Sequence, residues 1–553
     1  MIDSMTHRKL SQTTQRPSPT RQLHGTANTT LATWRTHILG SRILSISALM
    51  LAMASTATWA SDVKSQQTQA ADIASNIANN TDTCYVEGVS DRLNCGFVTV
   101  PENPNKPDGK QIQVHYVVLP AVKNVNHEEA LLAIAGGPGQ SAIDNAAGFD
   151  AMLSKVRQQR DILLIDQRGT GRSNLLTCDE GAQSPLSFDD DNADTLAETQ
   201  KCLAKIDADV TQYGSLNAIK DFEAVRQHLG YKKLHVYGIS YGTRMAQLYM
   251  RLYPAHLATV TLDGIVPMQQ SVLEIGASID RGFDLLFKDC QETAACHTQF
   301  PELKAEFDQV AASLAKAPVM ENVYDPVTGE KTMLTMTRGK FYGSIRMALY
   351  QANVRALVPH AIHQAAKHNF QPILGLYSLT IDNAGMAMGM HASVVCGEDM
   401  HRITPAMREQ AQHSFMGKTM LEGLEATCEV WKVPAVDDSF SEPISSDIPT
   451  LLLSGEIDPA TPPSWGELAM EKLTNAKHFV APYATHGVAY QSCANNLIAD
   501  LVRSGSVKDL DGECLKKDVR RSFYLNASSV EPLDATSTKT TTTDDNASTG
   551  AKE

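Results

Sequence analysis

Few of the patterns that mark nucleic-acid, nucleotide or metal binding occur in this 553-residue sequence. Its 48 Lys and Arg are outnumbered by 62 Asp and Glu, and a negative surface repels phosphate, which removes the main source of affinity for nucleic acid. The ten cysteines form no Cys-x-x-Cys pair, which argues against a zinc ribbon or a thioredoxin-type motif. Gly-Thr-Gly at 169–171 starts neither a Gly-x-Gly-x-x-Gly nor a Walker pattern. His360, His363 and His368 lack partner acids or cysteines, so we predict no metal and no cofactor.

Long apolar runs are also missing after residue 60, so we expect no membrane span in the mature chain. Residues 1–42 contain six Lys or Arg and one acid, an apolar run follows at 43–54, and small residues lead to Ala60. This order predicts a secretory signal peptide over residues 1–60. A membrane anchor is the alternative, although the run is short for a span. We expect an exported protein, periplasmic or secreted, and the even number of cysteines suits an oxidising compartment.

Short apolar runs alternate with helical periodicity in two parts of the chain, 84–267 and 448–526. Strands are predicted at 96–100, 112–118, 130–134, 161–165, 234–237, 259–263, 449–454 and 478–481, and helices near 216–229, 241–253, 464–474 and 489–502. Continuous apolar strands that end in glycine-rich turns are typical of a mostly parallel sheet with helices on both faces. We therefore predict one α/β domain that contains both parts.

Three further segments do not follow this alternation. Residues 268–447 show mostly helical patterns and are predicted to form a large helical insertion. Residues 61–83 are polar and rich in Ala, Asn and Gln, which indicates a flexible lead-in. Residues 527–553 are rich in Thr, Ser, Ala and Asp and contain too little apolar surface to compensate for ordering, so we predict a disordered tail.

Ser240 stands in Gly-Ile-Ser-Tyr-Gly at 238–242, between a predicted strand and a predicted helix. This is the context that a Gly-x-Ser-x-Gly nucleophile elbow requires. Glycines flank the serine because the turn is too tight for side chains, and the following helix points its N-terminus at the developing negative charge. The alternative is an ordinary glycine-rich turn. We predict that Ser240 is a catalytic nucleophile.

A nucleophilic serine needs a histidine base and an acid that orients it, and in this architecture the chain order is Ser, acid, His. Asp458 follows the predicted strand at 449–454, and Glu456 in the same loop competes with it for the role of the acid. His486 lies in a loop between the last predicted strand and the last predicted helix, beside a glycine. We predict a triad of Ser240, Asp458 and His486.

An oxyanion hole requires two backbone N–H donors. The N–H of Tyr241, directly after the nucleophile, is the first candidate. The second should come from the loop after an early strand, where Gly-Gly-Pro-Gly at 136–139 allows the backbone to approach the substrate closely. We predict Gly137 for this role, with Gly136 as the next choice, and a plain tight turn as the alternative.

These motifs carry a family resemblance over roughly residues 84–515. The motifs are Gly-Gly-Pro-Gly at 136–139, Asp-Gln-Arg-Gly-Thr-Gly-Arg-Ser at 166–173, Gly-Ile-Ser-Tyr-Gly at 238–242, Asp-Gly at 263–264 and Gly-Glu-Ile-Asp-Pro-Ala-Thr-Pro at 455–462. The chain resembles the proline iminopeptidase branch of the α/β-hydrolases, and more closely the secreted tripeptidyl aminopeptidase-like serine peptidases. Ala135 is a departure, since proline iminopeptidases usually carry His before the Gly-Gly-Pro-Gly sequence.

The resemblance implies an α/β-hydrolase fold with a helical cap over the serine, and cleavage of residues from free peptide N-termini. Such an enzyme must hold the substrate α-ammonium at a fixed distance from the serine, and a buried carboxylate does this. Glu398 and Asp399 follow an apolar run in the insertion and are candidates for that role. A capped turn or a surface ion pair is the alternative. Peptides with a free N-terminus are the expected partners.

The resemblance and the local spacing together predict that the cysteines pair with their sequence neighbours, since sequence alone leaves connectivity open. The predicted disulfides are Cys84–Cys95, Cys178–Cys202, Cys290–Cys296, Cys396–Cys428 and Cys493–Cys514. Free, buried thiols are the alternative, which is not expected in an exported chain with an even cysteine count.

Two other functions remain open at this stage. A carboxylesterase or lipase would use the same triad on an acyl ester and would need only a roomy apolar cap. The other alternative is a non-catalytic binding protein on a hydrolase scaffold, and an intact triad argues against it. An epoxide or haloalkane hydrolase on this fold would use Asp as the nucleophile, which Ser240 argues against.

Overall fold

The computed structural model describes residues 81–177, 184–326, 328–381 and 385–532. The predicted signal peptide, nearly all of the predicted lead-in, Cys178 and residues 533–553 of the predicted tail lie outside the described residues. Within the described part of the chain, no helix is both long enough and apolar enough to cross a membrane.

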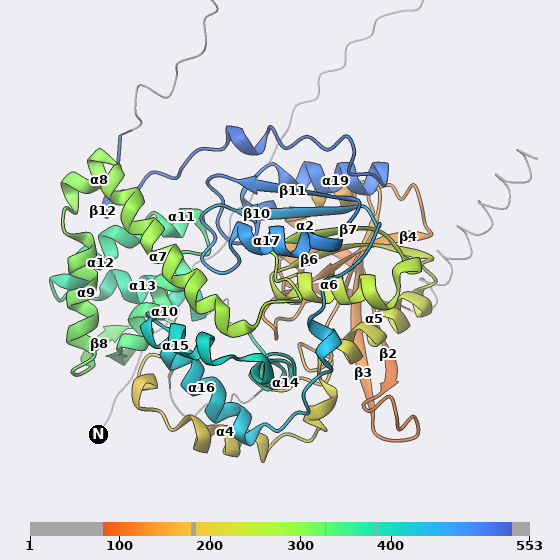
Figure 1. The fold of residues 1–553 in the computed structure, drawn as a ribbon, viewed down its shortest axis with the longest axis horizontal. Helices are drawn as coiled ribbons and strands as arrows, with labels where there is room; N and C mark the ends of the chain where they lie inside the picture. Colours follow the sequence, from red (N-terminus) through yellow and green to blue (C-terminus); the bar gives the residue numbers. More distant parts are fainter. Residues whose placement is uncertain (1–80, 178–183, 327, 382–384, 533–553) are drawn as a thin grey trace, which may run out of the picture. The chain divides into compact units, whose positions relative to one another are not determined.

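The described residues contain a sheet of nine strands, several of which are labelled in Figure 1. The strands are β1 (Asp82–Val86), β2 (Val89–Pro101), β3 (Gln111–Leu119), β4 (Glu129–Ile134), β5 (Asp161–Ile165), β6 (Lys233–Ile239), β7 (Leu257–Asp263), β10 (Thr450–Gly455) and β11 (Ala476–Ala481). Their order across the sheet is β1-β2-β3-β5-β4-β6-β7-β10-β11. The pairs β1–β2, β2–β3 and β3–β5 are antiparallel, and the other five pairs are parallel.

Both faces of this sheet are covered by helices, because its central strands are apolar on both sides. On one face, Leu132 and Val236 belong to a core with residues of α5 (Ser215–Leu229) and α6 (Tyr241–Leu252). On the other face, Leu131 packs in a separate core that includes residues of α2, α3 and α19. These three helices are α2 (Ala146–Met152), α3 (Ser154–Arg157) and α19 (Ala494–Ser504). The fold is therefore an α/β-hydrolase fold, which confirms the predicted fold class.

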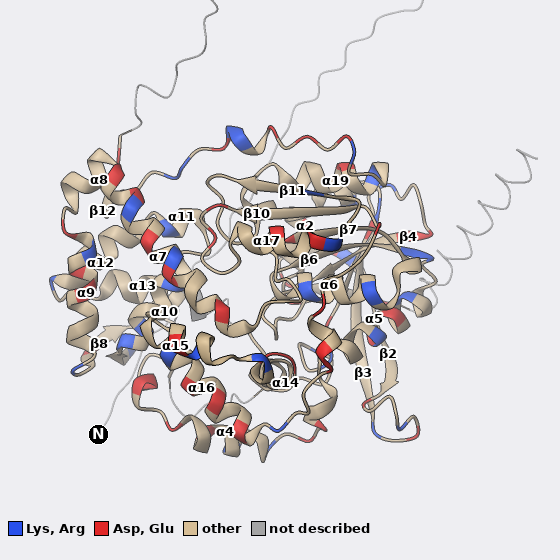
Figure 2. Ribbon diagram, in the orientation of Figure 1, with Lys and Arg blue, Asp and Glu red and all other residues tan. Residues whose placement is uncertain are grey.

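The insertion between β7 and β10 has a core of its own, with Phe283, Phe307 and Phe341 among its buried side chains. Its helices are α7 (Ile275–Glu292), α8 (Ala294–Gln299), α9 (Leu303–Leu314), α10 (Arg338–Ala348), α11 (Ala352–Arg355), α12 (Val358–Ala366), α13 (Gln371–Ile381), α14 (Met388–Glu398), α15 (Pro405–His413) and α16 (Gly417–Val430). The insertion also contains an antiparallel hairpin of β8 (Val319–Tyr324) and β9 (Lys331–Met336), which stands between α9 and α10 in the chain. Acidic and basic residues are interspersed over these helices, whereas the central strands of the sheet carry few of them (Figure 2).

Parts of the chain outside 268–447 also pack on the insertion. The helix α4 (Thr195–Leu203), which the sequence placed in the first part of the core, contacts α16. Leu186 belongs to the core of the insertion, and its carbonyl accepts a hydrogen bond from Thr335 of β9 at 2.8 Å. Leu186 and α4 therefore pack on the helical insertion, although they precede it in sequence.

The end of the described chain differs from the prediction of a tail that starts at 527. The short strands β12 (Tyr524–Asn526) and β13 (Ser529–Val530) pair antiparallel. Phe523 anchors them because its side chain is buried in the core of the insertion, and Tyr524 donates to the carbonyl of Ala356 at 3.0 Å. The predicted last helix is likewise divided into α18 (Val488–Gln491) and α19.

Disulfides join cysteines that are neighbours in sequence. The pairs in the structure are Cys84–Cys95, Cys290–Cys296, Cys396–Cys428 and Cys493–Cys514. Cys202 is also disulfide-bonded, and its predicted partner Cys178 lies outside the described residues. Cys396 lies in α14 and Cys428 in α16, so this bond ties together two cap helices.

Candidate active site

Ser240 occupies a sharp turn between β6 and α6. Its φ of 57° and ψ of −126° lie in a region that residues with a side chain rarely adopt. Hydrogen bonds hold this strained backbone: the Ser240 N–H donates to the carbonyl of Asp263 at 3.0 Å, and the N–H and hydroxyl of Thr243 donate to the carbonyl of Ser240 at 2.8 and 2.6 Å. The turn thus presents Ser240 at the carboxyl edge of the sheet, as the sequence pattern predicts.

The glycines around Ser240 are required by close backbone contacts. A Cβ at Gly238 would clash with the carbonyl of Gly242, and a Cβ at Gly242 would clash with the carbonyl of Ile134 at the end of β4. Without side chains at these two positions, the start of α6 packs directly against β4. This contact brings the serine beside the loop that follows β4.

His486 and Asp458 form a buried pair. The Nδ1 atom of His486 lies 2.9 Å from Oδ2 and 3.2 Å from Oδ1 of Asp458. Burial alone would raise the pKa of Asp458 and lower that of His486, but their mutual attraction and hydrogen bond reverse both directions. Asp458 is therefore held ionised, and the pKa of His486 is raised above its ordinary value.

The loop of Asp458 is fixed by contacts within itself. The N–H groups of Ala460 and Thr461 donate to Oδ1 of Asp458 at 2.7 and 3.0 Å, and the Thr461 hydroxyl donates to Oδ2 at 2.7 Å. The same hydroxyl oxygen is 3.2 Å from Nδ1 of His486. Sequence reasoning did not assign a role to Thr461, which here fixes both members of the pair.

Glu456, the competing acid, pairs with a residue of the cap, whereas His486 pairs with Asp458. Its side chain is 52% exposed and forms an ion pair of 3.1 Å with Arg281 of α7. Arg281 also donates to the backbone carbonyls of Glu456 and Asp458, at 2.5 and 3.3 Å. The cap therefore holds this loop through Arg281, and Asp458 alone of the two acids meets the histidine.

Asp263 connects the serine turn with the histidine loop, a role that the sequence analysis did not assign. Its carbonyl accepts the N–H of Ser240, while its buried carboxylate accepts the first two N–H groups of α18 (Val488–Gln491) at 2.7 and 2.9 Å. The next residue, Gly264, lies so close to the ring of His486 that a Cβ there would be 3.0 Å from Cε1. The one feature of the sequence that could have indicated this role is the position of Asp263, an acid at the end of a predicted buried strand.

Both predicted sources of oxyanion donors meet at Ser240. Tyr241 is the first residue of α6, where backbone N–H groups have no partner within the helix. On the other side, Gly136 approaches so closely that a Cβ there would be 3.0 Å from Cβ of Ser240, and Gly137 has a φ of +110°. The arrangement can place two backbone donors beside one serine.

The cap supports the loop that contains these glycines. The N–H of Ala387, the residue before α14, donates to the carbonyl of Gly139 at 2.9 Å. Within α14, Nδ1 of His391 lies 3.1 Å from the carbonyl of Pro138. From the core, the buried carboxylate of Asp166 accepts the hydroxyl of Ser141 at 2.6 Å and the N–H of Ile143 at 3.1 Å. The sequence of the Gly-Gly-Pro-Gly loop at 136–139 predicts neither of these two contacts.

Glu398 and Asp399 are both buried, but their surroundings differ. Glu398 lies at the N-terminus of α5, where the N–H and hydroxyl of Ser215 donate to its carboxylate at 2.7 and 2.8 Å. The Ser215 hydroxyl is also 2.6 Å from the hydroxyl of Tyr241, so Glu398 reaches the residue after the nucleophile through two hydrogen bonds. Burial raises the pKa of Glu398 to about 7.

Asp399 already has two cationic partners. Arg244 donates to its two oxygens at 3.0 and 3.2 Å, and Arg402 donates to Oδ1 at 2.8 Å. The N–H of Val272 donates to the same Oδ1 at 3.1 Å. Despite burial, these charges lower the pKa of Asp399. Of the two predicted acids, only Glu398 lacks a directly bonded cation in the described structure.

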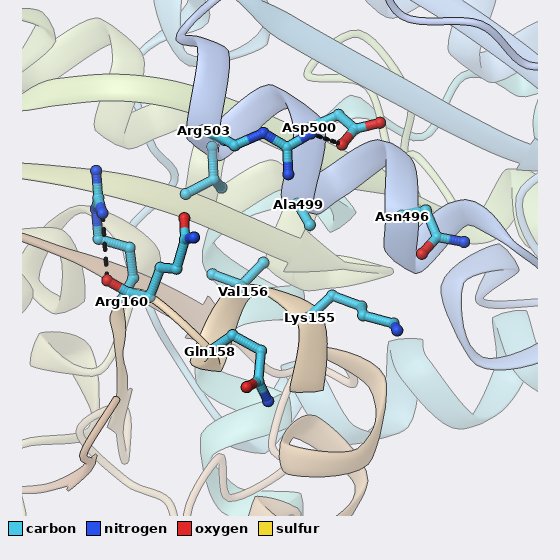
Figure 3. Close-up of a pocket in the computed structure, with 10 residues that line it drawn as sticks. Lys155, Val156, Gln158, Arg160, Asn496, Ala499, Asp500 and Arg503 are labelled. Carbon is cyan, nitrogen blue, oxygen red and sulfur yellow. Dashed lines mark hydrogen bonds and ion pairs between the residues drawn. The ribbon is translucent and has the colours of Figure 1, made fainter. Parts of the chain in front are cut away.

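Two hollows lie outside this cluster of side chains. One, of about 260 Å³, is formed by α3 and α19 and contains the basic side chains of Lys155, Arg160 and Arg503 (Figure 3). The other, of about 450 Å³, is lined by residues of the cap and by Glu456 and Trp465 of the core. The second hollow therefore borders the loop of Asp458.

The strand order, the serine turn and the His–Asp pair define a serine hydrolase of the α/β-hydrolase fold. Within this class, residues 413–514 match the family described as TAP-like protein. The chain is 25% identical to the serine protease Hip1 of Mycobacterium tuberculosis over 463 aligned residues. The alignment covers 76% of this chain and 87% of that protein. The chain is thus related to the TAP-like proteins, which confirms the predicted resemblance.

Two further comparisons give lower coverage or similarity. The tripeptidyl aminopeptidase of Streptomyces lividans is 26% identical over 255 residues, which are 41% of this chain and 47% of that protein. The crystal structure of the proline iminopeptidase of Mycobacterium smegmatis aligns at 15% identity with a TM-score of 0.32, over 74% of this chain and 98% of that one.

Proposed function

We propose that this protein is an exported serine aminopeptidase that releases N-terminal residues from peptides through an acyl-enzyme. The observation that carries the proposal is the buried His486–Asp458 pair joined through Asp263 to the strained turn of Ser240. Two relatives named as peptidases support a peptide substrate. Disulfides, which form in oxidising compartments, support export.

In this mechanism His486 takes the proton of Ser240 as the hydroxyl attacks the scissile carbonyl, and Asp458 stabilises the imidazolium that forms. The N–H groups of Tyr241 and Gly137 bind the negative oxygen of the tetrahedral intermediate. His486 then donates its proton to the leaving amine, and water attacks the acyl-enzyme in the reverse sense. No step requires a metal or a cofactor.

The pH profile is expected to report on His486. The histidine must be neutral to accept the serine proton, so kcat/KM falls as the pH is lowered through its pKa. Because the ion pair with Asp458 raises that pKa above the ordinary 6.5, half of the activity should be lost at a pH above 6.5. Stopped assays over a range of buffers measure this midpoint, and a midpoint below 6.5 would contradict the assignment.

A substrate panel separates the peptidase from an esterase with the same triad. Aminoacyl and tripeptidyl anilides with free amines are expected to be cleaved, and the same compounds with acetylated amines to react at least tenfold more slowly. p-Nitrophenyl esters serve as the comparison. Hydrolysis of esters together with indifference to the free amine would favour a carboxylesterase. Failure of a fluorophosphonate to label Ser240 would favour the non-catalytic reading.

Glu398 is the acid we propose for the substrate ammonium, because it is buried near the nucleophile and a carboxylate with two donors can accept more. Glu398→Gln is expected to raise KM for free-amine anilides about tenfold or more, with little change for acetylated ones. Asp399→Asn is the contrast: breaking its buried pairs costs roughly 3–5 kcal/mol of stability, and any loss of activity should be equal for both substrates. Equal effects of Glu398→Gln on both substrates would assign Glu398 to structure.

A further inference from the structure

A row of three side chains leads from the cap to the histidine of the triad. The ring of Tyr350 packs edge-on against the ring of His486, with centroids 4.9 Å apart. Arg346 of α10 donates from Nη2 to the Tyr350 hydroxyl at 3.4 Å, and its Cζ lies 6.0 Å from the centroid of the tyrosine ring. The hydroxyl of Thr485 donates to the carbonyl of Tyr350 at 2.7 Å, which ties the row to the histidine loop.

The side chain of Arg346 is half-buried and, unlike three fully buried arginines, it has no acid partner among the described residues. Bidentate or close ion pairs satisfy Arg168 with Asp221, Arg244 with Asp399 and Arg355 with Asp289. Among the described residues, no carboxylate lies within ion-pair distance of Arg346, and its buried Nε has no hydrogen-bond partner. A buried N–H donor without an acceptor costs free energy. An anionic ligand would supply the acceptor and balance the positive charge of Arg346.

The position of this charge relates it to the reacting bond. Arg346 interacts electrostatically both with His486 and with His391, which contacts the loop of the predicted oxyanion donors. In the proposed reaction His486 gives its proton to the leaving amine. A group that packs beside His486 from the cap therefore lies on the side of the leaving residue.

We propose that Arg346 binds a carboxylate on the leaving residue of the substrate, so that the enzyme favours peptides with an anionic group just after the cleaved bond. This inference rests on the proposed aminopeptidase function. The planar guanidinium pairs with a carboxylate through two parallel hydrogen bonds. The carboxylate is the C-terminus when one residue remains after cleavage, or an aspartate side chain in a longer peptide.

The test compares matched peptides that differ in one charge. Dialanine and tetra-alanine, as free acids and as C-terminal amides, cover release of one or three residues. The wild type is expected to prefer the acid at least tenfold in kcat/KM on whichever length it cleaves, and Arg346→Gln to reduce this preference below twofold. Peptide amides with Asp or Asn at the leaving position show whether a side-chain carboxylate serves as well.

Several controls separate binding from structural damage. Arg338→Gln, an exposed arginine on the same helix, should keep the wild-type preference. Arg346→Lys should keep part of it, because the charge remains without the planar fork. An anilide without a carboxylate should react with Arg346→Gln within about threefold of wild type, measured on the pH plateau. Removing this cation should also move the acid limb to higher pH, since Arg346 opposes protonation of His486.

The possible failures are distinct. If the wild type cleaves peptides but treats acids and amides alike, the carboxylate site is refuted and the aminopeptidase function stands. If no peptide is cleaved, the aminopeptidase function fails. Whether Arg346 binds a carboxylate is then tested by measuring how peptides inhibit the hydrolysis of p-nitrophenyl acetate. Dialanine should then inhibit at least fivefold better than its amide in the wild type and equally in Arg346→Gln; equal inhibition in the wild type would refute the site.

Discussion

Replacing Ser240 by alanine is expected to lower kcat/KM on the best anilide by on the order of 10⁵-fold or more, which corresponds to about 7 kcal/mol of lost transition-state stabilisation. The hydroxyl is the attacking group, and no neighbouring side chain can replace it in this turn. The remaining activity would come from the oxyanion donors and substrate binding alone. The measurement is steady-state kinetics with purified enzyme.

The fold of the Ser240→Ala variant should be unchanged, because the hydrogen bonds that hold the turn involve the backbone of Ser240 and not its hydroxyl. Circular dichroism and thermal unfolding check this. Ser504→Ala, at an exposed position at the end of α19, is the matched control and should retain full activity. Activity of Ser240→Ala within tenfold of wild type would remove the serine from the mechanism.

Much of the sheet follows from local sequence patterns. The central strands are short apolar runs with both faces buried, and their ends coincide with glycine turns, so their positions can be predicted without knowledge of their partners. The Ser240 turn is predicted for the same reason, since its glycines and the flanking periodicity lie within a few residues. Chain order alone then selects Asp458 and His486 from many acids and histidines.

What the sequence does not reveal depends on contacts between distant residues. Arg244 and Asp399 are separated by 155 positions, and no periodicity links them, so Asp399 was an equal candidate for substrate binding. The packing of α4 on α16 and the role of Asp263 are of the same kind. The hairpin of β8 and β9 was missed because its strands are short and half exposed within a helical region.

Replacing Asp458 by asparagine is expected to lower kcat by about 10⁴-fold, although the change removes a single charge and keeps the size of the side chain. In the native enzyme both oxygens of Asp458 accept hydrogen bonds, including those from Thr461 and from Nδ1 of His486. An amide NH₂ facing Nδ1 would donate to it and place the proton on Nε2. The histidine then cannot accept the proton of Ser240.

The asparagine variant should also lose the electrostatic support for the imidazolium, so its acid limb should move to lower pH as the pKa of His486 falls. This pair of effects distinguishes the orienting acid from a residue that only stabilises the fold. Glu456→Gln is the matched control in the same loop, because Glu456 is half exposed and pairs with Arg281. It should remain within about threefold of wild type, since an exposed ion pair contributes little. A larger loss in Glu456→Gln than in Asp458→Asn would reverse the assignment of the acid.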